Sequence, residues 1–155
     1  MPIENVKKGE NVRIFEPVNI YGCEIGDNTF IGAFVEIQRG VKIGKNCKIH
    51  PFAFIPTGVT IGDGVFIAQH VCFSNDKYPM AVNQDGSLKK ADDWKLLNTK
   101  VGNRVSIGMG AMILSGIEIG DGAVIGAGAI VTVNVPEHTL IRGNPARLHG
   151  RMYLK

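Results

Sequence analysis

A period of six residues runs through most of the chain and constrains its fold more than any other feature. Branched apolar residues occupy every sixth position over two long series: Ile25, Ile31, Ile37, Ile43, Ile49, Ile55, Ile61 and Ile67, then Val101, Ile107, Ile113, Ile119, Ile125 and Val131. Small or apolar residues recur four positions after most of these: Val35, Val41, Cys47, Ala53, Val59, Val65, Val71, Val105, Ala111, Ile117, Ala123, Ala129 and Val135. Hexapeptide self-similarity of this extent predicts a parallel β-helix.

The spacing within one repeat explains how such a coil closes. In the segment VKIGKN, residues 41–46, Val41 and Ile43 point to the core because alternate residues of a strand face the same side. Lys45 and Asn46 then turn a corner, and Gly and Asn tolerate the positive φ that a tight corner needs. Three such sides make a coil of about 18 residues, and coils stack at about 4.8 Å. The repeats predict an all-β fold of about five coils.

The period fails between Phe73 and Val101. A long irregular connection in a small domain is usually either functional or disordered. This segment carries Tyr78, Met80 and Trp94, which favours a loop that packs against something. We expect a single β-helix domain over residues 1–155, with an extruded functional loop at 74–100 and a C-terminal cap at 136–155. A passive surface loop is the alternative.

Composition excludes several classes of partner. Apolar residues make up 45% and charged residues 20%, and the net charge of +3 comes from scattered lysines and arginines, so nucleic acid is not expected as a partner. No apolar run approaches the roughly 20 residues that span a bilayer, so no membrane association is expected. The first residues lack the apolar stretch of a signal peptide, which predicts a cytoplasmic protein. The three cysteines form no CxxC pair and are expected to be free thiols.

Candidate catalytic residues cluster where the period breaks. Asp76 is the carboxylate at the point where the loop departs, and Asn75 precedes it. An amine must lose a proton before it attacks a thioester, and a carboxylate or imidazole beside it can take that proton. His70 is placed at the preceding corner, so one extended side of about 16 Å separates it from Asn75. The two can share a site only between neighbouring subunits. As alternatives, His70 is an ordinary surface residue, and Asn75 and Asp76 simply form a turn.

The second half of the chain offers candidate contacts for a cofactor. Gly108 and Gly126 are 18 residues apart, so they stack in adjacent coils and are expected to leave a shallow outward groove. Arg142 and Arg147 flank the sequence GNPA, and arginine suits contacts to phosphate. As alternatives, small residues merely suit the repeat, and the arginines cap the last coil.

The repeat and the ending resemble one enzyme family. The repeats IGDNTF, IGKNCK, IGDGVF and IGMGAM follow its pattern [LIV]-G-x-x-[small]-x, and IRGNPAR is similar to the ending of its CoA-dependent acetyltransferases. The residues themselves do not fix the handedness of the coil, whereas the resemblance implies a left-handed helix. It further implies a homotrimer with the active site between subunits and acetyl-CoA along the C-terminal coils, where Ser106 joins the four candidate contacts above.

The middle of the chain narrows the resemblance. Residues 50–79 look like nucleotide-linked amino-sugar N-acetyltransferases of surface-polysaccharide synthesis, in which a Phe-[Ser/Thr]-Asn corner opens a similar loop. The match implies a substrate or catalytic role for Asn75. Several relatives carry a Ser-His pair in the coil below, where this chain has Pro51 and Phe52. The resemblance therefore implies acetyl transfer to a sugar amine. The general base is then Asp76, His70 or no protein group at all, and the resemblance does not choose between them.

Two other functions are compatible with a β-helix. A γ-carbonic-anhydrase-like metal hydratase needs three metal-binding histidines with a close His-x4-His pair, which the chain lacks, so no metal is expected. A non-catalytic hexapeptide scaffold or binding subunit is the second alternative, against which the loop and the IRGNPAR ending argue. For the transferase we expect direct attack on the thioester, because Cys72, the thiol nearest the loop, has no basic partner in the pattern.

Overall fold

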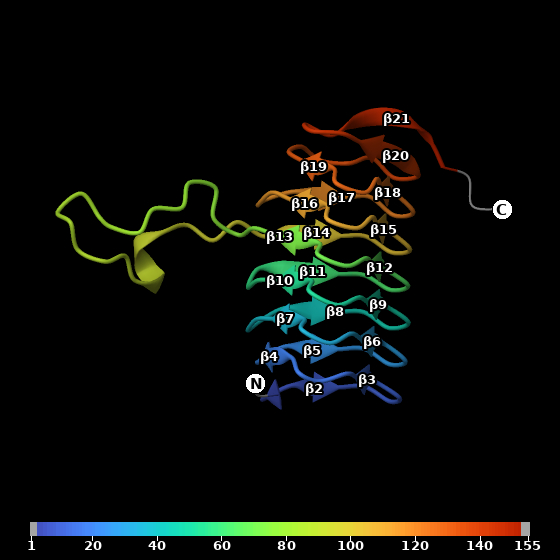
Figure 1. The fold of residues 1–155 in the computed structure, drawn as a ribbon, viewed down its shortest axis with the longest axis horizontal. Helices are drawn as coiled ribbons and strands as arrows, with labels where there is room; N and C mark the ends of the chain where they lie inside the picture. Colours follow the sequence, from blue (N-terminus) through green and yellow to red (C-terminus); the bar gives the residue numbers. More distant parts are fainter. Residues whose placement is uncertain (1–2, 153–155) are drawn as a thin grey trace.

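The computed structural model describes residues 3–152, which form a three-sided prism of stacked coils (Figure 1). Sheet A holds seven strands: β1 (Ile3–Glu4), β4 (Asn19–Tyr21), β7 (Glu36–Ile37), β10 (Phe54–Ile55), β13 (Cys72–Phe73), β16 (Met112–Ile113) and β19 (Ile130–Val131). Sheet B holds six: β2 (Lys7–Lys8), β5 (Glu24–Ile25), β8 (Lys42–Ile43), β11 (Val59–Ile61), β14 (Thr99–Val101) and β17 (Glu118–Ile119). Sheet C holds eight: β3 (Arg13–Ile14), β6 (Phe30–Ile31), β9 (Lys48–Ile49), β12 (Phe66–Ile67), β15 (Ser106–Ile107), β18 (Val124–Ile125), β20 (Thr139–Arg142) and β21 (Arg147–Arg151).

Parallel pairing at a fixed offset builds the prism. Phe54 pairs with Cys72, an offset of 18 residues, and the same offset joins Ile37 to Ile55. The second residue of each strand points inward, so the isoleucine series becomes a continuous buried column. The structure confirms the predicted parallel β-helix. Its sheets of six, seven and eight strands contain more coils than the predicted five, because the N-terminal strands up to Tyr21 join the stack although their repeat is less regular.

The corners rely on left-handed backbone and on side-chain caps. Asn28 and Asn46 adopt φ of 56° and 57° at the corner between sheets B and C. At the same corner Asp63 Oδ1 accepts a hydrogen bond of 2.9 Å from the Lys45 backbone N–H, one coil below. Asp121 Oδ1 accepts one of 2.7 Å from the Asn103 N–H. These bonds stitch coil to coil where the strands have ended.

The extruded loop leaves the corner between sheets A and B (Figure 1). Thr99 pairs with Val59 at an offset of 40 residues instead of 18, so 22 residues are inserted in this coil. Counting along the corner, the insertion lies between Asn75 and Asn98, at the positions where the coil below has Thr57 and Gly58. The loop carries one turn of 3-10 helix, η1 (Ala91–Asp93), and stands away from the prism as the sequence predicts.

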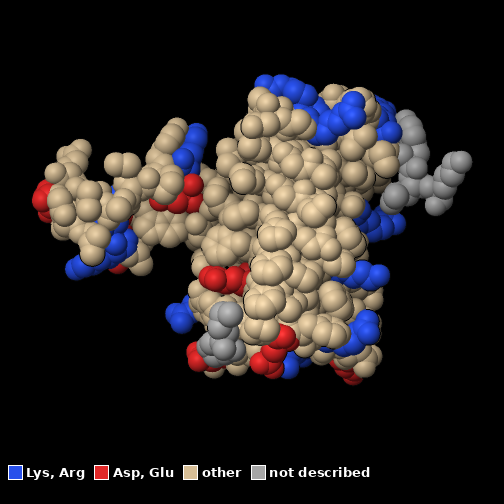
Figure 2. All heavy atoms as spheres, in the orientation of Figure 1, with Lys and Arg blue, Asp and Glu red and all other residues tan. Residues whose placement is uncertain are grey.

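The C-terminal end of the prism is closed by an antiparallel pair, β20 and β21, in which Arg142 lies opposite Arg147. Lys and Arg side chains gather over this end of the molecule (Figure 2). The last three residues of the predicted cap, 153–155, lie outside the described residues. Among the described residues, no helix has the length and apolar character needed to cross a membrane.

Candidate functional site

The three outer faces of the prism differ in chemistry. On sheet B the outward residues are exposed and mostly charged, with Glu24 beside Lys42 and Lys100 beside Glu118. On sheet A the outward residues above Glu36 are apolar or weakly polar, Phe54, Cys72, Met112 and Ile130, and Met112 is 51% exposed. The outer face of sheet C is mixed, with Phe30 and Phe66 beside Arg13 and Lys48. Because water readily solvates the charges on sheets B and C, sheet A is the face best suited to contact with another protein surface.

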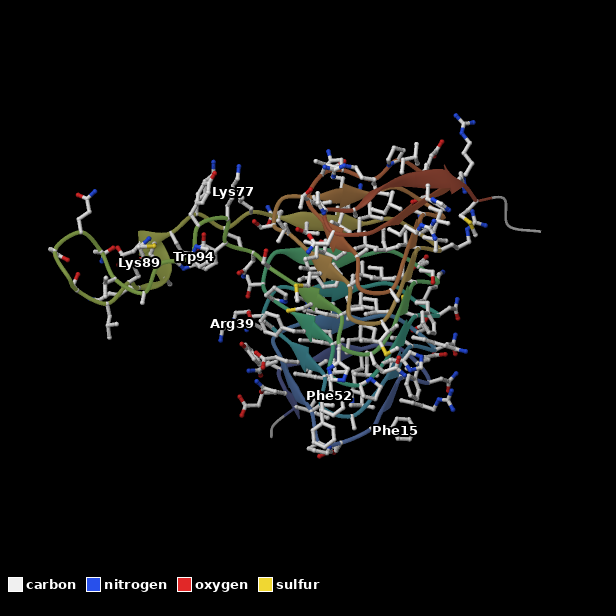
Figure 3. The ribbon with its side chains drawn as sticks, turned by 45° about the horizontal axis from the view of Figure 1, so that its top comes forward. Phe15, Arg39, Phe52, Lys77, Lys89 and Trp94 are labelled. Atoms are coloured by element: carbon white, nitrogen blue, oxygen red, sulfur yellow. The ribbon has the colours of Figure 1, made fainter. Side chains whose placement is uncertain are left out.

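The predicted site residue His70 ends a stack of rings on the corner between sheets C and A. The rings of Phe34 and Phe52 are parallel, with centroids 5.0 Å apart, and the His70 ring lies 4.8 Å beyond Phe52. All three residues adopt left-handed backbone, with φ of 61°, 65° and 60°. Aromatic residues rarely occupy this region. Phe52, labelled in Figure 3, therefore fixes the plane of the exposed imidazole, whose ring is parallel to its own.

The stack continues upward as an open track. Gly110 and Gly128 occupy the left-handed corner position in the next two coils, and a Cβ at either would have no heavy atom within 4 Å. At Gly108 and Gly126, where the sequence predicts a groove, neighbouring atoms occupy the space outside the backbone. A Cβ on Gly108 would come within 2.5 Å of the Ala127 backbone nitrogen. The backbone of the next coil fills the space that this missing side chain leaves.

The remaining predicted cofactor contacts surround the upper end of the track. Arg142 stands one coil above Gly126, whose Cβ would lie 2.9 Å from the Arg142 Cβ. Arg142 and Arg147 are cross-strand neighbours, and like charges directly opposite each other destabilise a strand pair unless an anion lies between them. Ser106 faces outward on sheet C between Phe66 and Val124, away from the track itself. The structure thus brings the two arginines together and leaves Ser106 apart.

Asn75 and Asp76 form the base of the loop. Asn75 Nδ2 donates to the Thr57 carbonyl at 3.1 Å, and the Asn75 carbonyl accepts from the Leu97 N–H at 3.0 Å. Asp76 Oδ1 accepts from the Tyr78 N–H at 2.9 Å, which is the turn geometry that the sequence offered as an alternative role. The turn occupies one carboxylate oxygen, so Oδ2 stays available to a substrate.

Asp76 lines three hollows around this base. One of about 350 Å³ lies between the loop and the corner residues Leu114–Ile117 and Thr132–Asn134 of the coils above. Two others, of about 510 and 440 Å³, open on the loop itself. Each has the volume of a small-molecule site. A further hollow of about 580 Å³ lies on the corner between sheets B and C, beside Arg104 and His138, and contains none of the predicted site residues.

One subunit does not unite these groups. His70 and the glycine track lie on the corner between sheets C and A, whereas Asn75 and Asp76 lie on the corner between sheets A and B. Strand β13 and the outer face of sheet A separate them, as the sequence predicts. A second copy is therefore required to bring the loop base against His70.

The ring stack was not predicted from the sequence, although the sequence contains a signal for it. Phe34, Phe52 and His70 are 18 residues apart and replace the Gly or Asn common at corners. The sequence likewise did not predict the surroundings of His50, whose ring lies 4.8 Å from Phe66 and whose Nε2 is buried without a hydrogen-bond partner. Nothing in the periodicity reveals such an orphaned atom, because burial there depends on which rings lie above and below.

The cysteines and metal-binding side chains complete the description. Cys23 and Cys47 are buried and Cys72 is exposed, and all three are free. Although Cys72 is exposed as a residue, partial desolvation by its surroundings raises the pKa of its thiol, which disfavours the nucleophilic thiolate. Within residues 3–152, no three His, Cys, Asp or Glu side chains are grouped so as to hold a metal ion.

The comparison with known families decides the affiliation of the chain. The model of the bacterial transferase hexapeptide family, six repeats, matches residues 22–57, 40–75 and 98–132, which together cover more than half of the chain. The chain belongs to this hexapeptide transferase family. Its prism is accordingly a left-handed parallel β-helix, and the site above is carried by a hexapeptide transferase scaffold.

Relatives of this chain include serine acetyltransferase of Escherichia coli, 38% identical over 89 residues that cover 57% of this chain and 32% of that protein. The chain spans between a quarter and about two fifths of the length of the curated relatives it matches. Among solved structures, a variant of AntD, an N-acyltransferase from Bacillus cereus in complex with dTDP and coenzyme A, matches with a TM-score of 0.82 and 20% identity, covering 95% of this chain and 84% of AntD. PerB from Caulobacter crescentus, in complex with CoA and GDP-perosamine, matches with a TM-score of 0.66 and 20% identity, covering 96% of this chain and 57% of PerB. These two likenesses establish the fold.

Proposed function

We propose that the protein is an acetyl-CoA-dependent N-acetyltransferase that acts as a homotrimer on the amino group of a nucleotide-linked amino sugar. The acetyltransferases among its sequence relatives support the reaction class, and the ligands of AntD and PerB support the acceptor class. The observation that carries the proposal is the open track of Gly110 and Gly128, which leads from the imidazole of His70 to the paired arginines Arg142 and Arg147.

The track suits an extended cofactor with an anionic end. His70 and Arg142 are separated by three coil steps, about 14 Å at the usual strand spacing. The guanidinium groups of Arg142 and Arg147 bind phosphates of CoA, and the pantetheine arm lies over bare backbone at Gly128 and Gly110. The thioester then arrives beside His70.

The chemistry of the faces supports the trimer. The apolar outer residues of sheet A, Phe54, Met112 and Ile130, and the exposed ring of Phe52 become buried when this face meets a neighbouring prism. A threefold arrangement presents the loop base of one subunit to the ring stack of the next, and closes without leaving an open face. Asp76 of one copy and His70 of its neighbour then border the same thioester.

The reaction is a direct acyl transfer. The Asn75 side-chain oxygen orients the sugar amine, and Asp76 Oδ2 or the His70 imidazole accepts its proton. The nitrogen attacks the thioester carbonyl carbon, and a backbone N–H beside the track stabilises the developing oxyanion. The C–S bond then breaks and CoA leaves as the thiol after taking up a proton. Cys72 is not an acyl carrier, since its raised pKa disfavours the thiolate.

A steady-state assay with acetyl-CoA and a dTDP- or UDP-linked amino sugar tests the proposal. Asn75→Ala should lower kcat/KM at least ~10-fold, equivalent to about 1.4 kcal/mol of transition-state stabilisation. Cys72→Ala is the matched control in the same coil and should keep most of the activity.

Three outcomes would contradict the proposal. An acetylated enzyme trapped by mass spectrometry after acetyl-CoA alone would overturn direct attack. Acetyl transfer to sugar hydroxyls but not to sugar amines would show that the acceptor group is a hydroxyl. If calorimetry detects no binding of acetyl-CoA, the non-catalytic scaffold or binding subunit becomes the favoured alternative.

A further inference from the structure

The extruded loop is a folded element with its own hydrogen bonds. Its tip closes through an antiparallel bridge between Val82 and Leu88, and Asn83 Nδ2 donates to Asp93 Oδ2 at 3.1 Å. The same carboxylate accepts from the Lys90 N–H at 2.8 Å, which ties the tip to η1. A loop held in this way presents a fixed surface, and the side chains on it keep their relative positions.

Trp94 divides the surface of the loop into two hollows. Both hollows, of about 510 and 440 Å³, are lined by Trp94, Lys89 and Asp76. The smaller one adds Lys77, Tyr78 and Lys95. Figure 3 shows Trp94 between Lys89, toward the loop tip, and Lys77, toward the prism. Trp94 is half-buried, so one part of the indole is anchored and the other is accessible.

Lysines outnumber acids at the smaller hollow, although the loop from 76 to 97 is neutral overall, with four lysines and four aspartates. Within the described residues the one ion pair is that of Lys7 with Glu24, so Lys77, Lys89 and Lys95 form no ion pair. The hydrogen bond from the Lys90 N–H and, less strongly, the charge of Lys89 lower the pKa of the Asp93 carboxyl. Asp93 and Asp85 bond to groups of the loop itself, and Asp76 is the acid in the hollow. Lys77 Nζ lies 5.3 Å from the centre of the Tyr78 ring. Unpaired ammonium groups beside an aromatic plane suit a ligand that is both planar and anionic.

We propose that this loop surface binds the nucleoside diphosphate part of the acceptor, with the base stacked on Trp94 and the diphosphate held by Lys77, Lys89 and Lys95. The inference rests on the proposed function and assigns the recognition of the nucleotide to this chain's own loop. A sugar attached to that diphosphate extends toward Asp76, since Asp76 lines both hollows. The nucleotide is thus held by the loop while the amine reaches the corner where Asn75 lies.

Trp94 is the one tryptophan of the chain, so intrinsic fluorescence reports on this surface directly. The experiment titrates the full-length protein with dTDP, UDP, inorganic pyrophosphate and thymidine. Saturable quenching by the two nucleoside diphosphates is expected, with binding at least ~10-fold tighter than that of thymidine or pyrophosphate, because each of these supplies only one of the two contacts.

Substitutions then test the assignment of residues. Lys89→Ala should weaken dTDP binding at least ~5-fold, as losing one charge-assisted contact predicts. The matched control Lys42→Ala, on the outer face of sheet B, should leave it unchanged. Trp94→Leu should abolish dTDP binding in calorimetry, while circular dichroism and acetyl-CoA affinity remain those of the wild type.

The outcomes separate the two proposals. If neither nucleoside diphosphate quenches Trp94, or if Lys89→Ala and Lys42→Ala behave alike, the loop site is wrong even when acetyl-CoA binds and amines are acetylated. If the Trp94 fluorescence differs between trimer and monomer but does not change when any nucleotide is added, Trp94 packs on a neighbouring copy. The loop site is again wrong in that case. Failure of the wild type to bind acetyl-CoA sinks the proposed function, whatever the nucleotides do.

Discussion

At the scale of single residues, the left-handed corner positions determine what the surface of this prism can do. Glycine or asparagine fills most of them at little conformational cost. Phe34, Phe52 and His70 occupy three successive ones, each against a preference of about 1–2 kcal/mol for other conformations. The stacking of their rings, worth about 0.5–1.5 kcal/mol per pair, offsets part of that cost. Because stacking offsets only part of this cost, the three rings are candidates for a functional role, and Gly110 leaves the same corner of the next coil free.

The first prediction concerns this free level. Gly110→Asn keeps the left-handed backbone, which Asn28 and Asn46 adopt in this protein, but places a side chain in the track. We expect the dissociation constant for acetyl-CoA to rise at least ~10-fold in calorimetry, with little change in Tm. Gly40→Asn is the control, since Gly40 also has a positive φ and open space but lies outside the track. If the two variants bind acetyl-CoA with equal affinity, the cofactor does not lie along this track.

A second residue-scale prediction concerns the caps between coils. Asp121→Ala removes the acceptor of the 2.7 Å hydrogen bond from the Asn103 N–H, and should lower the free energy of unfolding by about 1–2 kcal/mol in urea titrations. Hydrogen bonds from Asn103 hold the pKa of the Asp121 carboxyl below its usual range. Its contribution is therefore complete above a pH of about 4 and disappears as the pH falls through the lowered pKa. A difference between wild type and variant that persists undiminished in strong acid would contradict this account.

At the scale of elements, the loop is separable from the prism that carries it. Its insertion between Asn75 and Asn98 leaves strands β13 and β14 in register with the coils below, and Thr99 still bonds to the Gly58 carbonyl through its N–H at 3.0 Å. The core beneath the loop is continuous, with Phe73 and Val101 both buried. The loop thus adds recognition to a scaffold that is complete without it.

Deleting residues 76–97, with Asn98→Gly to copy the Thr57-Gly58 corner, should therefore give a folded prism without activity. We expect a change in Tm of less than about 4 °C and acetyl-CoA binding that stays within a few-fold of the wild type. Acetyl transfer to a nucleotide-linked amine should become undetectable in the same assay, because Asp76 and the loop surface are gone. A variant that still acetylates such a substrate would exclude the loop from the site.

At the scale of the whole molecule, one prism holds two halves of a site on two corners. Sheet A lies between them with an apolar outer face, whereas sheet B presents alternating charges. In the proposed trimer, association through sheet A would bury the apolar face and complete the proposed site in the same step. Oligomerisation and activity should then be lost together.

Met112→Glu tests this coupling. Met112 is 51% exposed in the isolated chain, so the charge is tolerated there, but it becomes costly when a neighbour covers sheet A. Light scattering should give a trimer for the wild type at micromolar concentration and a monomer for the variant, with loss of acetyl transfer. Thr60→Glu, on the outer face of sheet B between Lys42 and Lys100, is the control and should remain a trimeric, active protein. A monomeric wild type would refute the shared site.

The sequence by itself determined the parallel β-helix, because a period of six places the core residues of every strand on the same inner side, whereas the handedness of the coil does not follow from the residues. The isoleucine series, the corner residues and the position of the loop can all be read from spacing, since each contact within a coil stack is set by the repeat. The turn at Asp76 follows from local sequence in the same manner, whereas the antiparallel pairing of Arg142 with Arg147 is found only in the structure.

The tertiary structure alone decided where the open space lies. Gly108 and Gly110 are both glycines of the same coil, but the backbone of the next coil covers Gly108 and leaves Gly110 free. The hollows around Trp94 likewise depend on how the loop folds back between Val82 and Leu88, which no periodicity governs. A repeat dictates which residues stack along the axis, whereas the space around them is set by where each Cβ points at a corner and by an insertion that obeys no repeat.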